Sequence, residues 1–305
     1  MHIPSSMLEG SICPVTAVVS AAGIAAAAYS AVKSKNKPDA ARFGAVTALI
    51  FAAQMMNFPI QHGTSGHLLG GVLAAALLGT PFGVLAIALV LAIQCLVFSD
   101  GGFSVLGANI LNMAILGAGL GGFLTTRLLK SASIKSVKDA VTLGGIAWAS
   151  VVIAALACSI ELAVSGTIAF SQVAVAMLLT HALIGIGEGL ITVAGCFLFA
   201  TETVSSPKKW FRAAPLMASA FIAMILSPFA SGYPDGLEWV AEKFQFLHES
   251  APAFVSPLPD YAVPQISNEA VSTGLAGLAG VIITFFLAWG IAKFLTSFKP
   301  VEVTS

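Results

Sequence analysis

The first two residues of the chain, Met1 and His2, form a dipeptide that can chelate a metal ion. Methionine aminopeptidase removes Met1 only before a small residue, so we expect Met1 to stay in front of His2. The Met1 amine, the His2 amide and the His2 imidazole Nδ1 then offer three nitrogens, which close a five-membered and a six-membered chelate ring. Deprotonation of the amide favours ions that accept four nitrogens in a plane, such as Ni²⁺ or Cu²⁺. The alternative is that His2 is an arbitrary residue at a frayed terminus.

A fourth nitrogen is expected from the sequence NFPIQHGTSGHLLGG at residues 57–71. Its Gly-Thr-Ser-Gly run predicts a compact turn that starts a helix, with Thr64 or Ser65 as the N-cap and His67 on the first turn. His67 would point into the helical bundle, where a histidine can also be a satisfied structural group. Placed on the same side as Met1, His67 adds one nitrogen to the three and completes a square plane.

Four further polar residues lie inside apolar stretches. Asn109 and Asn112 are three residues apart on one helix face, where they could orient metal ligands by hydrogen bonds or join helices to one another. His181 and Glu188 lie two helical turns apart on one face, and His181 could support the metal site. Glu188, an ionisable group at membrane depth, is a functional candidate, either as a hydrogen-bond anchor or in docking and gating.

The composition places these residues in a membrane protein. Of 305 residues only 9% are charged, against roughly 25% in ordinary globular proteins, and 57% are hydrophobic. The mean hydropathy is +0.94. A chain this apolar cannot cover its core with a polar surface, so its solvent must be lipid. Zero net charge gives no indication of nucleic-acid binding.

The expected fold is all-α, a polytopic transmembrane bundle of about nine helices arranged as seven plus two. Apolar stretches of about 20 residues mark these helices. They cover residues 13–32, 41–58, 65–80, 82–99, 104–129, 139–161, 170–200, 213–231 and 271–296.

The distribution of lysine and arginine sets the expected orientation. With the N-terminus outside, 13 of the 14 basic residues lie on the inner side and only Lys243 lies outside. We therefore expect the N-terminus outside, the C-terminus in the cytoplasm and the chain in a bacterial plasma (inner) membrane. Met1 and residues 57–71 then open on the same side.

The outer connection at residues 232–270 differs in composition from the rest of the chain. It carries five prolines, six acidic residues and one lysine. This shift predicts a boundary near residue 205, between a domain at 1–205 and a two-helix domain at 206–305.

The motifs resemble those of a known transporter family. The N-terminal MHIP, GTSGHLLGG, GANILNMA and HALIGIGEGLIT are similar to the substrate-binding M subunit, or S component (CbiM/NikM), of cobalt and nickel energy-coupling-factor (ECF) transporters. This resemblance covers residues 1–200. The sequence SGYPDGLEWVAEK at residues 231–243 resembles the small N subunit (CbiN/NikN, PDGLE domain), fused here to the M subunit.

The resemblance implies how the metal is bound and which partners act. It implies that Met1, His2 and His67 bind the transported Ni²⁺ or Co²⁺, with no permanent cofactor. It also implies a coupling transmembrane T subunit (CbiQ/NikQ-like) and a cytoplasmic ATPase pair (CbiO/NikO-like), because this chain has no Walker motif of its own. Family members often continue MHIP with Asp-Gly, whereas this chain has Ser5-Ser6, which removes an acidic side chain from that position.

Other interpretations stay open at this point. An intramembrane metalloenzyme would hold a catalytic ion with His67, His181 and Glu188, although an HExxH motif is absent. A purely structural membrane subunit would bind no metal. Four planar nitrogens slightly favour Ni²⁺ over Co²⁺. In the outer loop, the carboxylates of Asp235, Glu238 and Glu242 could collect cations, or the loop could cover the metal site.

Overall fold

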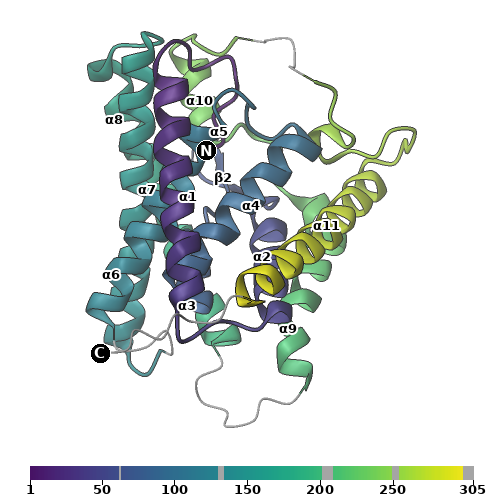
Figure 1. Cartoon of the computed structure of the whole chain (residues 1–305). Coiled ribbons are helices and arrows are strands. Elements are labelled where there is room, and N and C mark those ends of the chain that lie inside the picture. Colours follow the sequence, from purple (N-terminus) through teal and green to yellow (C-terminus); the bar gives the residue numbers. More distant parts are fainter. Residues whose placement is uncertain (62, 130–133, 201–208, 249–253, 298–305) are drawn as a thin grey trace.

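The structure is a computed structural model and describes residues 1–61, 63–129, 134–200, 209–248 and 254–297. The helices form one bundle, with α6 and α9 at one end and α10 at the other (Figure 1). Within the described ranges, six helices are long and apolar enough to cross a membrane. They are α1 (Ile12–Lys33), α4 (Thr80–Phe98), the continuous segment Leu106–Leu128, α7 (Val137–Ser165), α8 (Phe170–Phe199) and α11 (Glu269–Ser297).

Each of the nine predicted apolar stretches contains a helix, which confirms the all-α membrane bundle. The shorter apolar helices are α2 (Ala40–Gln54), α3 (Gly71–Leu78) and the consecutive segments α9 (Lys209–Phe221), η2 (Ile222–Leu226) and η3 (Ser227–Phe229). The segment Leu106–Leu128 divides into α5 (Leu106–Asn109), the π-helical η1 (Ile110–Leu120) and α6 (Gly121–Leu128). The sidedness of the bundle stays a prediction.

The secondary structure outside these helices is short. It comprises the two-residue strands β1 (Phe58–Pro59) and β2 (Ser65–Gly66), the helix α10 (Gly236–Lys243) and the 3₁₀ turn η4 (Pro259–Tyr261). The strands pair antiparallel, with Phe58 opposite Gly66.

Small residues let the long helices pack closely. A Cβ atom at Gly189 of α8 would lie 2.9 Å from the carbonyl oxygen of Gly144 in α7. Large apolar side chains such as Leu190 and Phe197 instead point outward from α8 and are exposed. This division matches a helix pair in lipid, where close backbone contact joins helices and apolar surface faces the membrane.

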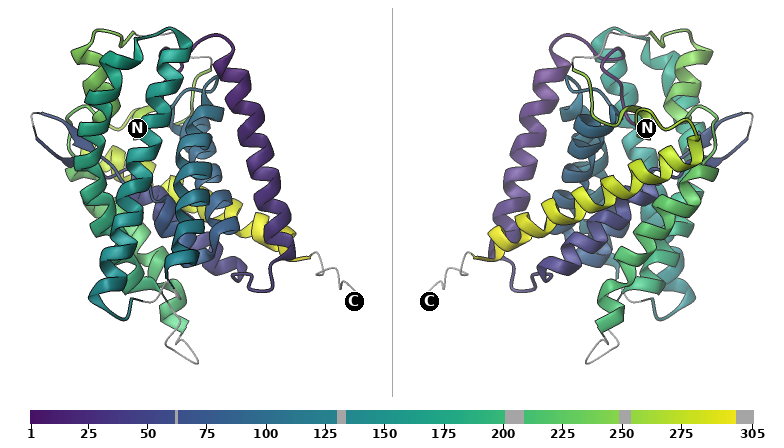
Figure 2. Two further views of the ribbon diagram at one scale, coloured as in Figure 1. Left: turned by 90° about the vertical axis from the view of Figure 1, so that its left-hand side faces the viewer. Right: turned by 90° about the vertical axis from the view of Figure 1, so that its right-hand side faces the viewer.

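The C-terminal helices pack on the earlier part of the chain. Helices α9 and α11 lie against α2, and α11 also contacts α4. At Gly280 of α11, a Cβ atom would overlap the ring of Phe51 in α2, so glycine is required for this close approach. The predicted boundary near residue 205 falls in 201–208, outside the described residues. Figure 2 shows α11 crossing the bundle obliquely and the N-terminus lying among the helices.

Candidate metal-binding site

The first residues of the chain are held inside the bundle without regular secondary structure. Ile3 is fully buried, and its N–H donates to Oδ1 of Asn109 at 2.8 Å, while Nδ2 of Asn109 donates back to the Ile3 carbonyl at 3.1 Å. The N–H of Gly102 donates to the same carbonyl at 2.9 Å. Asn109 thus binds the backbone as a neighbouring strand would, and fixes the residue that follows His2.

Two glycines make room for this segment. A Cβ atom at Gly102 would overlap the backbone nitrogen of Ser5, and one at Gly101 would lie 3.5 Å from Cβ of His2. Gly101 also has a φ of +85°, a backbone conformation that residues with a side chain rarely adopt. The loop after α4 therefore depends on glycine to let the N-terminus approach.

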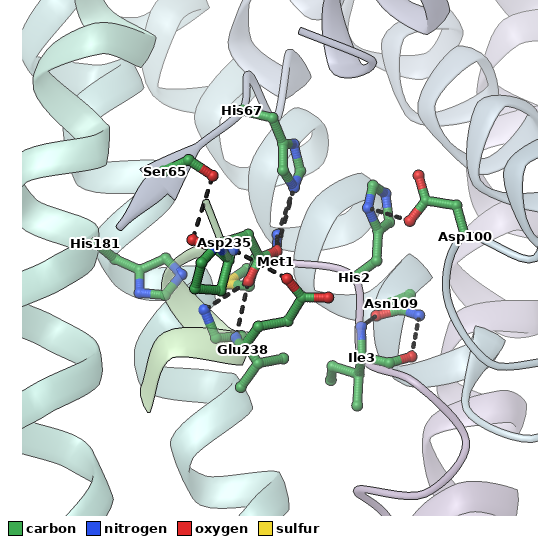
Figure 3. Close-up of polar contacts among 12 residues, drawn as sticks. Met1, His2, Ile3, Ser65, His67, Asp100, Asn109, His181, Asp235 and Glu238 are labelled. Atoms are coloured by element: carbon green, nitrogen blue, oxygen red, sulfur yellow. Dashed lines mark hydrogen bonds and ion pairs between the residues drawn. The ribbon is translucent and has the colours of Figure 1, made fainter. Parts of the chain in front are cut away.

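The amine of Met1 lies between a histidine and a carboxylate (Figure 3). It contacts Nε2 of His67, 66 residues away in the sequence. It also forms an ion pair with Oδ2 of Asp235 at 2.6 Å. Burial alone would raise the pKa of Asp235, but the charge of the Met1 ammonium and its hydrogen bond hold it below its ordinary value. Asp235 therefore stays a carboxylate.

His67 presents a free lone pair toward the amine. Its Nδ1 lies 2.9 Å from the carbonyl oxygen of Leu68, which can only accept, so Nδ1 carries the proton and Nε2 is the acceptor. Burial lowers the pKa of His67 to about 3, and the Met1 ammonium adds to this effect. His67 is therefore neutral near pH 7, as a metal ligand must be. The rings of His2 and His67 are nearly parallel, 4° apart in plane, with centroids 4.9 Å apart.

The ring of His2 contacts Asp100, which in turn accepts a hydrogen bond from Tyr261. Its Nδ1 lies 3.0 Å from Oδ1 of Asp100, and the hydroxyl of Tyr261 donates to Oδ2 of Asp100 at 2.6 Å. Burial would raise the pKa of Asp100, but the contacts with His2 and Tyr261 hold it below its ordinary value. Nε2 of His2 is buried without a hydrogen-bond partner.

The segment that carries His67 differs from the prediction. We expected a helix from residue 65, capped by Thr64 or Ser65, but Ser65 and Gly66 form β2 and the helix begins at Gly71. Ser65 instead contacts the outer loop: its N–H donates to the Pro234 carbonyl at 2.8 Å and its hydroxyl to the Tyr233 carbonyl at 2.7 Å. Contacts with distant parts of the chain thus override the local helix signal.

Two side chains from helices fix residues 69 and 70. Glu188 of α8 accepts hydrogen bonds from the N–H groups of Leu69 at 2.6 Å and Gly70 at 2.9 Å. Nε2 of Gln54 in α2 donates to the Leu69 carbonyl at 2.7 Å. Glu188 therefore acts on the backbone next to His67 and not on the amine itself.

In the described part of the chain, Asn112 and His181 form hydrogen bonds elsewhere and none with the Met1 amine. Asn112 donates to Oε2 of Glu161 in α7 at 2.7 Å. Nδ1 of His181 lies 2.8 Å from the Met177 carbonyl one turn earlier in α8. His181 packs against the first turn of α10, where a Cβ atom at Gly236 would lie 3.1 Å from its Cε1. His67, His181 and Glu188 do not form one group that could hold a metal: among the described residues, no three His, Cys, Asp or Glu side chains do so.

A cavity of about 350 Å³ borders the site. The N-terminal part of the chain and the outer loop both line it. The lining residues that carry ionisable or amide groups are His2, Gln54, Asn57, His67, Asp100, Asp235, Glu238, Asp260 and Tyr261. The carboxylates give the cavity the charge that attracts a cation.

Sequence reasoning missed several of these contacts. Asp100 is a rare acidic residue followed by two glycines, in the sequence SDGG, and this pattern could have identified it as a candidate site residue. Asp235 was considered only as one of several carboxylates in the loop. Tyr261 and Gln54 carried no recognisable signal, because their roles depend on how loops and helices dock.

Comparison with known proteins agrees with this architecture. Residues 2–205 match the CbiM family, described as the cobalt uptake substrate-specific transmembrane region, and residues 209–297 match the PDGLE domain. A putative fused nickel transport protein NikMN of Archaeoglobus fulgidus is 35% identical, and the match covers 96% of this chain and 99% of that protein. The fused nickel transport protein NikMN of Rhodobacter capsulatus is 28% identical over 93% of this chain and 94% of its own.

A solved structure is also similar. The crystal structure of a truncated transition metal transporter superposes with a TM-score of 0.55 at 30% identity, over 64% of this chain and 95% of its own. The buried N-terminal segment, two histidines and an acidic cavity thus occur in a membrane bundle whose relatives are named as nickel or cobalt transport proteins. The chain belongs to the CbiM family of metal-transport proteins and carries a PDGLE domain after its CbiM region.

Proposed function

We propose that the chain captures Ni²⁺ or Co²⁺ through four nitrogens: the Met1 amine, the His2 amide, Nδ1 of His2 and Nε2 of His67. The contact between the Met1 amine and Nε2 of His67 carries this proposal, because it joins two of the four donors across 66 residues of sequence. The neutral state of His67 supports it, since a protonated imidazole cannot bind a metal.

Capture exchanges protons for the metal at nearly constant charge. A protonated Met1 amine carries one positive charge beside Asp235. A divalent ion bound to a neutral amine and a deprotonated His2 amide also leaves one net positive charge. Asp235 can therefore balance both forms, which avoids an unpaired charge in a buried site. For Nδ1 of His2 to bind the metal, the ring must turn away from Asp100 and Nδ1 must give up the proton that it donates there, either to Nε2 by a change of tautomer or to solvent.

We propose that the two predicted domains, 1–205 and 206–305, share the site. The donor nitrogens come from the first domain. The outer loop of the second supplies Asp235 next to the amine and Tyr261 next to Asp100. These contacts support the interpretation that the loop at 232–270 covers the metal site. They do not favour the alternative, in which its carboxylates collect cations.

We propose that partner subunits supply the energy for uptake. A coupling T subunit (CbiQ/NikQ-like) and an ATPase pair (CbiO/NikO-like) would move the metal inward across the plasma membrane, with the N-terminus outside. The distribution of 13 of the 14 basic residues on one side supports this orientation. We expect the site to prefer Ni²⁺ to Co²⁺, because four planar nitrogens suit low-spin Ni²⁺.

The test is Ni²⁺ and Co²⁺ titration of the detergent-purified chain in two forms. One form has a free Met1, verified by intact mass. The other carries a long histidine-free N-terminal extension that converts the amine into a peptide bond. A one-residue extension is unsuitable, because it creates a new chelate of one amine, two amides and one imidazole. We expect one equivalent of metal in the free form and none in the extended form. Equal binding by both forms would contradict the proposal.

A further inference from the structure

The peptide group between Leu68 and Leu69 is bound on both sides. Its carbonyl oxygen accepts the hydrogen bond from Nδ1 of His67 at 2.9 Å. Its N–H, on Leu69, donates to Oε2 of Glu188 at 2.6 Å. One planar peptide unit therefore connects the carboxylate of Glu188 in α8 to the imidazole of His67.

The second oxygen of Glu188 binds the next peptide group along the chain. Oε1 accepts the N–H of Gly70 at 2.9 Å, so the carboxylate holds two successive N–H groups. Gly70 has a φ of +74°, a left-handed conformation that suits glycine. Gln54 binds the Leu69 carbonyl from the opposite helix at 2.7 Å. The backbone after His67 is thus fixed from α8 and from α2.

Hydrogen bonds in such a chain strengthen one another. A carboxylate that accepts from a peptide N–H polarises the peptide and makes its carbonyl a better acceptor. A better acceptor at Leu68 holds the proton on Nδ1 of His67 and makes Nε2 a stronger donor to a metal. Histidine ligands commonly gain this support from a carboxylate or a carbonyl on the other ring nitrogen.

We propose that Glu188 is the positioning residue for His67, acting through the Leu68–Leu69 peptide to fix the ring orientation and to keep Nε2 free for the metal. This inference rests on the proposed function. Glu188 is fully buried and is 119 residues from Leu69 in the sequence. Ile184, one turn earlier on α8, also packs on this segment, since a Cβ atom at Gly66 would lie 2.7 Å from its Cγ1. The position of His67 therefore follows that of α8.

The experiment compares Glu188→Gln with His67→Ala and with the double variant, each with a free Met1. Glu188→Gln places an NH₂ group against one of the two N–H donors and breaks that hydrogen bond. The readouts are Ni²⁺ affinity and the electron paramagnetic resonance spectrum of bound Cu²⁺, which reports the number of nitrogen donors. The matched control is Glu161→Gln, a buried carboxylate in α7 that accepts a hydrogen bond from Nδ2 of Asn112.

We expect Glu188→Gln to lower Ni²⁺ affinity by about 10- to 100-fold, the usual effect of losing such a supporting contact. Its Cu²⁺ spectrum should move toward that of His67→Ala. In the His67→Ala background, Glu188→Gln should change affinity less than about twofold, because linked residues are not additive. Glu161→Gln should keep the wild-type spectrum.

Several results would overturn the inference. These are a wild-type spectrum for Glu188→Gln, additive effects in the double variant, or an equal effect of Glu161→Gln. If Glu188→Gln does not fold, Glu188→Asp replaces it, and a wild-type spectrum there overturns the inference equally. Failure of the proposed function looks different, because His67→Ala would then itself leave metal binding unchanged.

Discussion

Asp235 binds the amine of Met1 with one carboxylate oxygen and begins a helix with the other. Oδ2 lies 2.6 Å from the amine nitrogen, while Oδ1 accepts the N–H groups of Leu237 at 2.7 Å and Glu238 at 2.9 Å as the N-cap of α10. The side chain of Glu238 completes the capping box on the Asp235 N–H. The start of α10 is thereby anchored on the first residue of the chain.

Replacing Asp235 with asparagine should separate these two roles. Asparagine is as good an N-cap as aspartate, so α10 should still begin at the same place. The buried ammonium of Met1 would lose its counter-charge, which typically costs about 3–5 kcal/mol when one partner of a buried pair is removed. We expect a lower melting temperature for chelator-treated Asp235→Asn protein in detergent than for the chelator-treated wild type.

The control for this prediction is Glu242→Gln, an exposed carboxylate on the same helix. It should leave the melting temperature unchanged. An unchanged melting temperature for Asp235→Asn would show that the ion pair contributes nothing to the docking of α10.

Alanine at Gly102 should displace the N-terminal segment. The added methyl group would overlap the backbone nitrogen of Ser5, and backbone cannot move as a flexible side chain can. We expect Gly102→Ala to lose more than about tenfold in Ni²⁺ affinity while the bundle stays folded. Gly145→Ala in α7 is the control, since its Cβ would meet no atom within 4 Å. Equal affinities for the two variants would contradict the close approach.

Acid should destabilise the protein through His67. Its pKa is about 3 in the folded chain because burial penalises the charged ring, against 6.5 when exposed. Between these values the unfolded chain binds the additional proton, so stability falls as the pH decreases. At pH 5 the loss relative to pH 7 should be about 2 kcal/mol from this residue. Thermal unfolding against pH should show this slope, and His67→Gln should make it shallower.

Metal uptake should distinguish His67 from His181, since both are buried histidines but only His67 contacts the Met1 amine. In cells that carry the complete transporter, we expect His2→Ala and His67→Ala to abolish metal-dependent uptake while the protein still reaches the membrane. His181→Gln should retain uptake within about twofold. Normal uptake by either of the first two variants removes that residue from the proposed donor set.

The long helices could be predicted because lipid imposes a length and a composition on each span. Each predicted apolar stretch contains a helix, including the segment at Leu106–Leu128. The start of α3 could not be predicted in this way. Residues 65–70 resemble a helix start locally, but Glu188, Gln54 and Pro234 bind their backbone from distant parts of the chain.

The site was predictable only in part for the same reason. Residue chemistry identified Met1, His2 and His67 as donors, and topology placed them on one side; their role as ligands stays a prediction. Helical spacing placed Asn109 and Asn112 on one face, yet one binds Ile3 and the other Glu161. The contacts of Tyr261 depend on how the outer loop docks, and the loop has no periodic pattern that would fix its path.

Proton release should show whether the His2 amide is a ligand. Met1 enters the site as an ammonium paired with Asp235 and must lose one proton to bind a metal. A coordinated amide nitrogen releases a second proton, whereas His67 releases none, because its pKa of about 3 keeps it neutral near pH 7. Calorimetric Ni²⁺ titrations in buffers of different ionisation enthalpy should therefore give at least about two protons per ion, from the amine and the amide, and one more if the Nδ1 proton of His2 leaves the ring. A value near one would mean that the amide stays protonated and that a different fourth donor completes the site.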